Sequence, residues 1–190
     1  MSTYRESLDA WLGELSVSAG TVFDVGGSQL KLKDRVANWN VDEYLIFDLK
    51  QPHIDSPAPD VVCDLNSGHN LDAVGYMGLA DEVYCLEVFD YIYRPELALK
   101  TLRGLIKGNG VLWVSFPTVY PVHNPAEHDA LRYTLPGIEK LAKLVKLNIE
   151  EVVPRRPKTN ALGMLYAAEG LRAAKGYDND VLGYLVRFSR

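Results

Sequence analysis

Cysteine is scarce in this sequence: the chain has 190 residues and two cysteines, Cys63 and Cys85. They lie far apart, and each falls in an apolar run, so we expect two buried, reduced thiols rather than a disulfide or a metal-binding pair. Reduced thiols are typical of cytoplasmic proteins. The first residues also lack the apolar core of a secretory signal peptide. The sequence therefore predicts a cytoplasmic location.

Long apolar runs and an excess of basic charge are also lacking. No run approaches the length needed to cross a bilayer, which argues against a membrane-spanning protein. The 20 Lys and Arg residues are outnumbered by 25 Asp and Glu residues, and the net charge is −5. A negative chain is repelled by phosphate backbones and anionic lipids, so we expect neither nucleic acid nor a membrane as the main partner. Nothing in the sequence indicates an oligomeric state.

Repeats, low-complexity tracts and linkers are absent as well, and the length suits a single domain with a full hydrophobic core. What is present is a β-prone segment, residues 21–25, that ends in an acid and a glycine pair. Gly26 and Gly27 allow a tight turn and a close approach of ligand to backbone. A strand followed by such a turn is typical of nucleotide sites in α/β proteins. Asp24 either faces a positive part of a ligand or is a polar residue of the turn.

Strand-like and helix-like segments alternate along the rest of the chain. Period-two and apolar runs predict strands over residues 21–25, 43–47, 61–65, 82–88, 111–116, 149–153 and 183–188. Helical spacing predicts helices over residues 3–15, 71–78, 95–107, 134–145 and 160–174, with Gly108 ending the third. Residues 29–39 could be helical, although their periodicity is poor. This alternation predicts a mostly parallel sheet with helices on both faces. The helix over 3–15 either packs on the sheet edge or lies over a ligand, and packing is favoured.

Polar residues follow several of the predicted strands. Asp48 lies 24 residues beyond Asp24, where an acid accepts hydrogen bonds from ribose hydroxyls; its alternative role is an exposed turn. Asp64 and Glu87 end the next two strands. The ends of parallel strands meet at one edge of a sheet, so we expect these acids to line one crevice.

At this point the chain resembles the class I S-adenosylmethionine-dependent methyltransferases, most closely the small type 11 branch that includes members associated with bacterial surface glycans. Residues 22–27, Val-Phe-Asp-Val-Gly-Gly, are similar to the family's first motif, and residues 44–48, Tyr-Leu-Ile-Phe-Asp, to its ribose-binding strand. Residues 60–65, 86–96 and 105–115 are similar to its adenine segment, its fourth-strand segment and its fifth strand. Residues 120–134 are similar to the segment that precedes its next helix. The order and spacing of these motifs together are specific.

The resemblance implies a Rossmann-like α/β methyltransferase fold over residues 1–190, with a seven-stranded sheet and one antiparallel strand among the last two. It implies an N-terminal helix in residues 1–18, a cofactor-binding half in residues 20–117 and an acceptor-side half in residues 118–190. The cofactor is S-adenosylmethionine, and the acceptor is a small molecule or a glycan. The implied cofactor-binding residues are Asp24, Gly26, Gly27, Ser28, Asp48, Asp64, Leu65 and Glu87.

The catalytic candidates come from the long loop after the central strand, because such loops often carry function. A hydroxyl acceptor must lose a proton, and a histidine suits that task at neutral pH, which makes His123 and His128 candidates. Arg132 could bind an anionic or polyhydroxylated acceptor, or form a salt bridge with Asp129. Each histidine is otherwise a surface residue of the loop. A metal site built from these histidines and Asp129 fits no standard ligand spacing, and we expect no metal.

Two residues depart from the family pattern, because Ser28 and Leu30 occupy positions where glycines are expected. They favour the alternative of a methyltransferase-like protein that has lost catalysis and acts by binding. The segment also lacks the second and third glycines of a nicotinamide-binding fingerprint, which makes a dehydrogenase a weak alternative.

Overall fold

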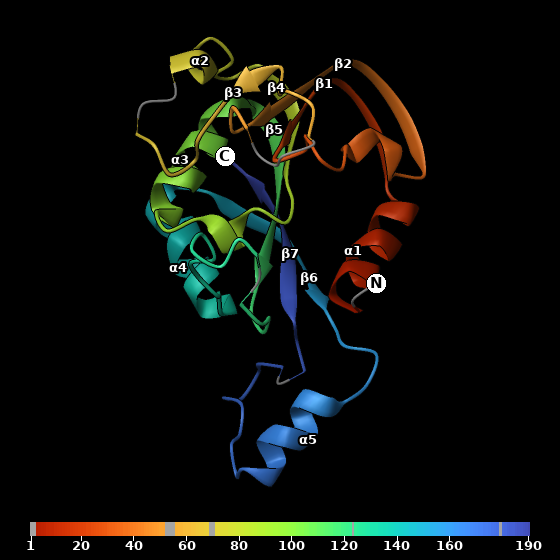
Figure 1. Ribbon diagram of the computed structural model, residues 1–190, viewed down its shortest axis with the longest axis vertical. Helices are drawn as coiled ribbons and strands as arrows, with labels where there is room; N and C mark the ends of the chain where they lie inside the picture. Colours follow the sequence, from red (N-terminus) through yellow and green to blue (C-terminus); the bar gives the residue numbers. More distant parts are fainter. Residues whose placement is uncertain (1–2, 52–55, 69–70, 123, 179) are drawn as a thin grey trace.

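The computed structural model describes residues 3–51, 56–68, 71–122, 124–178 and 180–190. Its centre is a seven-stranded sheet in the order β3-β2-β1-β4-β5-β7-β6 (Figure 1). The strands are β1 (Ser16–Val25), β2 (Asn38–Asp48), β3 (Val61–Val62), β4 (Ala80–Cys85), β5 (Ile106–Pro117), β6 (Asn148–Arg155) and β7 (Gly183–Ser189). Strands β1 to β5 pair in parallel, and β7 runs antiparallel to both β5 and β6. The predicted α/β fold and its single reversed strand are confirmed.

Helices cover both faces of this sheet. On one face lie α3 (Pro95–Leu105) and α4 (Leu135–Val145), whose residues Leu99, Leu102 and Ile138 are fully buried in the larger core cluster. The N-terminal helix α1 (Thr3–Glu14) lies on the other face, as Figure 1 shows, and buries Leu8 and Leu12 in a second cluster. A short helix α2 (Leu71–Val74) follows β3. The sheet therefore has a core on each side, as expected for a mostly parallel sheet.

Several predicted elements are found close to their expected positions. Helix α3 begins with Pro95 in its first turn, where the missing amide donor costs nothing. Thr134 caps α4, and its hydroxyl accepts a hydrogen bond from the amide of Gly137 at 3.3 Å. The predicted strand at 21–25 lies in the middle of the sheet, between β2 and β4.

Two other segments differ from what the sequence suggested. Residues 29–39 do not form an α-helix: they contain a single 3-10 turn (Leu32–Asp34), and β2 already begins at Asn38. The turn forms because the amide of Leu32 donates to the buried Asp24 carboxylate, which holds the segment close to β1. Gly108 does not end α3, because the helix stops at Leu105 and β5 starts at the next residue.

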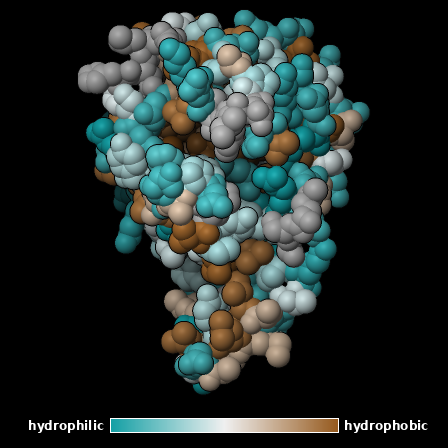
Figure 2. All heavy atoms as spheres, in the orientation of Figure 1, coloured by the Kyte–Doolittle hydropathy of each residue, from teal (hydrophilic) through white to brown (hydrophobic). Residues whose placement is uncertain are grey.

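The last helix is shorter than predicted and protrudes from the sheet. Helix α5 (Ala161–Ala168) ends six residues before the predicted position and contains no buried residue. Figure 1 shows it below the rest of the molecule, and Figure 2 shows hydrophobic side chains gathered there. Met164 and Leu165 are exposed by 68% and 55%. Among the described residues, none of the helices is both long and apolar enough to cross a membrane.

Candidate active site

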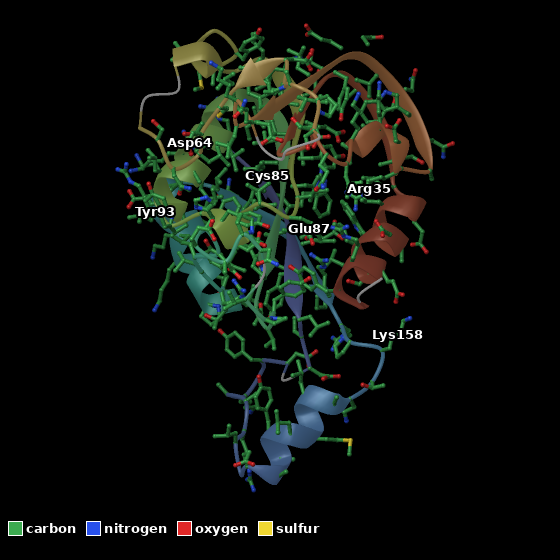
Figure 3. The ribbon with its side chains drawn as sticks, in the orientation of Figure 1. Arg35, Asp64, Cys85, Glu87, Tyr93 and Lys158 are labelled. Carbon is green, nitrogen blue, oxygen red and sulfur yellow. The ribbon has the colours of Figure 1, made fainter. Side chains whose placement is uncertain are left out.

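A cavity of about 1040 Å³ opens at the carboxyl ends of the parallel strands. Its wall contains the last residues of β1, β2 and β5 and the residues that directly follow β3 and β4. In Figure 3, Asp64 and Tyr93 lie toward α3, Arg35 lies toward α1, and Glu87 lies between them. The cavity occupies the crevice beside β1, where the strand order reverses and α/β proteins bind their ligands.

The structure requires glycine at both positions after β1, for a different reason at each. Gly26 has φ of 87°, which L side chains rarely adopt, and a β-carbon there would lie 2.2 Å from the side chain of Val88. Gly26 lines the cavity and donates its amide to the carbonyl of Phe47 at 2.7 Å. A β-carbon at Gly27 would instead lie 2.2 Å from the Asp24 carboxylate. The first glycine therefore opens the site, and the second lets the loop pass over a buried acid.

The Asp24 carboxylate holds the glycine turn from beneath and does not line the cavity. Its Oδ2 accepts hydrogen bonds from the amide of Leu32 at 2.8 Å and from the hydroxyl of Tyr44 at 2.5 Å. Burial raises the pKa of Asp24 to about 6, although these two hydrogen bonds oppose the shift. The sequence left two roles open for Asp24, contact with a ligand or a polar residue of the turn, and its contacts in the structure favour the second.

Asp48, Asp64 and Leu65 all line the cavity from the ends of β2 and β3. Asp48 accepts the amide of Ser28 at 3.1 Å and that of Leu49 at 2.8 Å, which ties the glycine loop to β2. Asp64 accepts the amide of Asn66 at 2.9 Å, and its side chain is exposed. Neither Ser28 nor Gly27 lines the cavity, and the buried hydroxyl of Ser28 has no hydrogen-bond partner among the described residues.

Glu87 lines the cavity just beyond β4, in a left-handed conformation with φ of 58°. Its amide donates to the Ser115 hydroxyl at 2.6 Å, and its Oε1 accepts Arg155 Nη1 at 2.5 Å. Arg155 comes from the end of β6 and is 2% exposed. Sequence reasoning missed Arg155 because nothing in the pattern of β6 distinguishes a buried arginine from a surface one.

The loop after β5 gives a mixed result for the catalytic candidates. His128 lines the cavity, but Arg132 does not. The Arg132 guanidinium binds the Asp129 carboxylate at 2.5 and 2.7 Å and the carbonyls of Tyr120 and Pro121 at 3.0 and 3.1 Å. These contacts favour its alternative role, the salt bridge with Asp129. His123 lies outside the described residues, so its predicted role stays a prediction.

Asp90 is a second residue that sequence reasoning did not select. It belongs to a 3-10 turn (Phe89–Tyr91) after β4, lines the cavity and is 9% exposed. Burial raises the pKa of Asp90 to about 7, with smaller contributions from the nearby carboxylates of Glu87 and Asp129. A carboxyl group with this pKa can exchange a proton near neutral pH. The raised pKa needs tertiary burial, so no sequence signal could have identified it.

The N-terminal helix also contributes to the cavity. Tyr4 and Arg5 of α1 line the cavity, so this helix both packs on the sheet and borders the site. Among the described residues, no group of three or more His, Cys, Asp or Glu side chains could hold a metal ion. The metal site considered from the sequence includes His123, which lies outside them. Cys63 and Cys85 are free and buried, as predicted.

Comparisons with known proteins give matches at the level of structure. No family model and no curated protein sequence matches the chain. A methyltransferase from Mesorhizobium loti is 14% identical, with 100% of this chain and 98% of that one covered at a TM-score of 0.59. One from Leishmania major is 8% identical, with 98% and 72% covered at a TM-score of 0.61.

A third match was solved with ligands bound. It is the 1,6-didemethyltoxoflavin-N1-methyltransferase of Burkholderia thailandensis, with 1,6-didemethyltoxoflavin and S-adenosylhomocysteine. It is 12% identical, and the match covers 98% of this chain and 77% of that one at a TM-score of 0.58. Likeness at these identities concerns the backbone rather than the residues of the site. The chain has the Rossmann-like fold of the S-adenosylmethionine-dependent methyltransferases.

Proposed function

We propose that this protein is an S-adenosylmethionine-dependent methyltransferase that acts on a small-molecule or glycan-type acceptor. One observation carries the proposal. Gly26, in its positive-φ conformation directly after β1, opens onto a cavity beside the carboxylates of Asp48 and Asp64 on neighbouring strand ends. The sequence resemblance to the type 11 branch supports the same class, and the two free thiols support a cytoplasmic location.

The charges around the cavity fit this cofactor, which carries an ammonium and a sulfonium charge. Among the lining residues, the carboxylates of Asp48, Asp64 and Glu87 lie on the strand-end wall, and the arginines are Arg5 and Arg35. Arg35 is already bound to Asp9 at 2.8 Å, outside the lining. Glu87 is paired with Arg155, so the negative charge near Gly26 comes mainly from Asp48 and Asp64, and it favours a positively charged ligand.

We assign the lining residues according to the order of the motifs. Gly26 and Glu87 border the methionine part of the cofactor, Asp48 accepts its ribose hydroxyls, and Asp64 with Leu65 borders its adenine. Asp24, Gly27 and Ser28 do not reach the cavity and hold the glycine turn in place. Bound in this way, the cofactor would supply the electrophilic methyl group, so the protein mainly has to position the acceptor and remove its proton.

The acceptor side lies between the 3-10 turn after β4 and the loop after β5. We propose that residues of the 118–190 half, with Asp90, meet the acceptor there. His128 and Asp90 line this side and are the candidates that take the acceptor proton. Because Arg132 is fully engaged with Asp129 and backbone carbonyls, we assign it to shaping the loop, and a neutral acceptor fits better than an anionic one.

The alternative of a binding protein without catalysis rested on Ser28 and Leu30. The Ser28 side chain is buried away from the cavity, so its β-carbon does not narrow the space for a ligand. Leu30 does line the cavity, but 43% of its surface is exposed to solvent. These positions favour the enzyme over the alternative.

Calorimetric titration with S-adenosylmethionine tests the proposal. The wild type should bind, and Asp48→Ala should weaken binding by about 1.5–3 kcal/mol, the usual worth of hydrogen bonds to a charged group. The matched control is Asp42→Ala, which removes an exposed acid from the first half of the same strand. The control should bind like the wild type.

Two results would contradict different parts of the proposal. Absence of binding to the wild type at millimolar ligand would rule out the methyltransferase function. Equal affinity of Asp48→Ala and wild type, with both proteins folded by circular dichroism, would remove only the ribose assignment of Asp48.

A further inference from the structure

Arg155 is a fully buried cation with partners in two separate parts of the cavity wall. It ends the edge strand β6, and its side chain is 1% exposed. Nη1 donates to Glu87 Oε1 at 2.5 Å, and Nη2 donates to the backbone carbonyl of Tyr4 at 2.5 Å. Nε lies 3.3 Å from the Ser7 hydroxyl, and the guanidinium carbon lies 3.4 Å from the centre of the Tyr4 ring. The planar guanidinium of Arg155 therefore binds both Glu87, after β4, and the first turn of α1.

The first turn of α1 forms a wall of the cavity. Tyr4 and Arg5 line the cavity, and the Tyr4 ring lies 4.7 Å from that of Tyr120, another lining residue. The Ser7 hydroxyl donates back to the Tyr4 carbonyl at 2.7 Å, so the oxygen that Arg155 binds is also fixed within the helix. Movement of this turn would change the width of the cavity on the α1 side.

The two halves of α1 are held by different forces. The second half is anchored by burial of Leu8 and Leu12 and by the ion pair between Asp9 and Arg35. The first turn is held by Arg155, by the buried Tyr4 ring with its contact to Tyr120, and by an exposed ion pair between Glu6 and Lys158. An exposed ion pair contributes little, whereas the hydrogen bonds of a buried guanidinium are strong. The first turn can therefore loosen while the rest of the helix stays packed.

Glu87 is fixed by the same arginine. Its Oε1 accepts Arg155 Nη1 and lies 3.2 Å from the Ser115 hydroxyl, and its left-handed backbone aims the residue at the cavity. We propose that Arg155 is a positioning residue that holds the first turn of α1 against the cavity and orients Glu87 in the same contact. It thereby slows release of the cofactor of the proposed function. The holding of α1 does not depend on which ligand binds.

Hydrogen exchange on the ligand-free protein tests the first part of the proposal. In Arg155→Met, exchange in peptides from residues 3–14 should become about tenfold faster, which corresponds to about 1.4 kcal/mol of local stability. Peptides from β4 and β5 should keep wild-type rates. Arg103→Met is the matched control, because Arg103 also binds a backbone carbonyl, that of Lys146, but does so beside α3 and α4, on the opposite face of the sheet from α1. It should leave exchange in α1 unchanged.

Arg155→Lys separates positioning from simple charge neutralisation. A lysine keeps a positive charge beside Glu87, but it lacks the planar fork that reaches Tyr4 and Ser7 as well. Arg155→Met leaves Glu87 without its cation and should lower the melting temperature. We expect Arg155→Lys to have a melting temperature close to that of the wild type, but to keep the fast exchange in α1 that Arg155→Met shows. Full restoration of slow exchange by Lys would overturn the proposal, and so would equal acceleration in all peptides of Arg155→Met.

The second part of the proposal is tested with S-adenosylhomocysteine as the probe. Its dissociation, followed by stopped flow, should be about tenfold faster from Arg155→Lys than from the wild type, because most changes at a site act on the dissociation rate. Loosened α1 with unchanged dissociation would overturn the link to the ligand. A wild type that does not bind the probe would refute the proposed function, while the exchange experiment would still decide the role of Arg155 in holding α1.

Discussion

Buried acids near the cavity give the folded protein a pH dependence that exposed acids do not. The pKa of Asp24 is raised from 3.8 to about 6, chiefly by burial, with a smaller contribution from the charge of Asp48. Tyr44, Leu32 and Arg35 oppose the shift without removing it. Asp90 is raised in the same direction, to about 7. Both residues are easier to bury in the protonated form, so the fold loses stability when they ionise.

The sign of this effect follows from the two pKa values of Asp24. Below pH 3.8, both folded and unfolded chains hold the proton, and the residue contributes nothing to pH dependence. Between pH 3.8 and about 6, the unfolded chain loses the proton first, so the free energy of unfolding decreases as pH rises. The loss amounts to about 3 kcal/mol once the pH is above 6, at roughly 1.4 kcal/mol per pH unit.

Asp24→Asn should therefore reduce the loss of stability between pH 4 and 7, because the amide oxygen can still accept from Leu32 and Tyr44 but carries no charge. Urea unfolding of the variant and the wild type at several pH values would measure it. Asp42→Asn, at an exposed position, is the control and should show the wild-type dependence. Parallel curves for Asp24→Asn and wild type would mean that Asp24 does not titrate as described.

At the scale of elements, helix α4 ends in a conformation that its sequence does not favour. Lys146 follows the helix with φ of 58° and ψ of 48°, and its amide caps the carbonyls of Ala142 and Lys143. The left-handed conformation suits glycine at this position and strains any residue with a β-carbon. The cap nevertheless forms because Leu147 is buried immediately after it, and burial of that side chain fixes the direction of the chain.

Lys146→Gly should raise the free energy of unfolding by roughly 0.5–1 kcal/mol, because glycine relieves the strain of positive φ. The matched control is Lys143→Gly, three residues earlier inside the helix, which should lower it by about 1 kcal/mol. Chemical denaturation of both variants measures the two effects. The same substitution is expected to act in opposite directions, and a loss of stability in both would disprove the role of strain at the cap.

The sequence predicted the elements whose pattern depends on burial alone. Helices α3 and α4 and strand β7 show regular apolar spacing or a continuous apolar run, and they were found near their expected positions. Residues 29–39 were not predictable in this way, because their path depends on the hydrogen bond from Leu32 to Asp24, which no periodicity reports.

The residues of the candidate site also fall into those that the sequence could predict and those that it could not. Gly26, Asp48, Asp64 and Glu87 were predicted from the motifs and do line the cavity, whereas Asp24, predicted in the same way, does not. Arg155 lies 68 positions from Glu87 in the sequence, and its place in the site follows from the edge position of β6. Contacts between distant segments depend on the completed sheet, so local patterns could predict which strands form the site but not which side chains connect its walls.

Stability is distributed unevenly over the whole molecule. The sheet and its helices bury their apolar residues, and Phe116 is fully buried in contact with the rings of Phe89, Tyr133 and Phe188, which come from three other segments. Helix α5 lies outside this core, as Figure 1 shows, and buries none of its residues. Helix α5, which we call the protruding arm, therefore contributes little to the free energy of unfolding, although most of its side chains are apolar.

Phe116→Ala should lower the free energy of unfolding by about 3–5 kcal/mol, because it removes a buried ring and leaves a cavity among its neighbours. Met164→Ala deletes a comparably apolar side chain from α5 and should change it by less than about 0.5 kcal/mol, since 68% of that residue is already in contact with water. Guanidinium unfolding of both variants compares the two positions directly. A loss above about 2 kcal/mol for Met164→Ala, the range typical of buried methionines, would mean that the arm is packed against the body in solution.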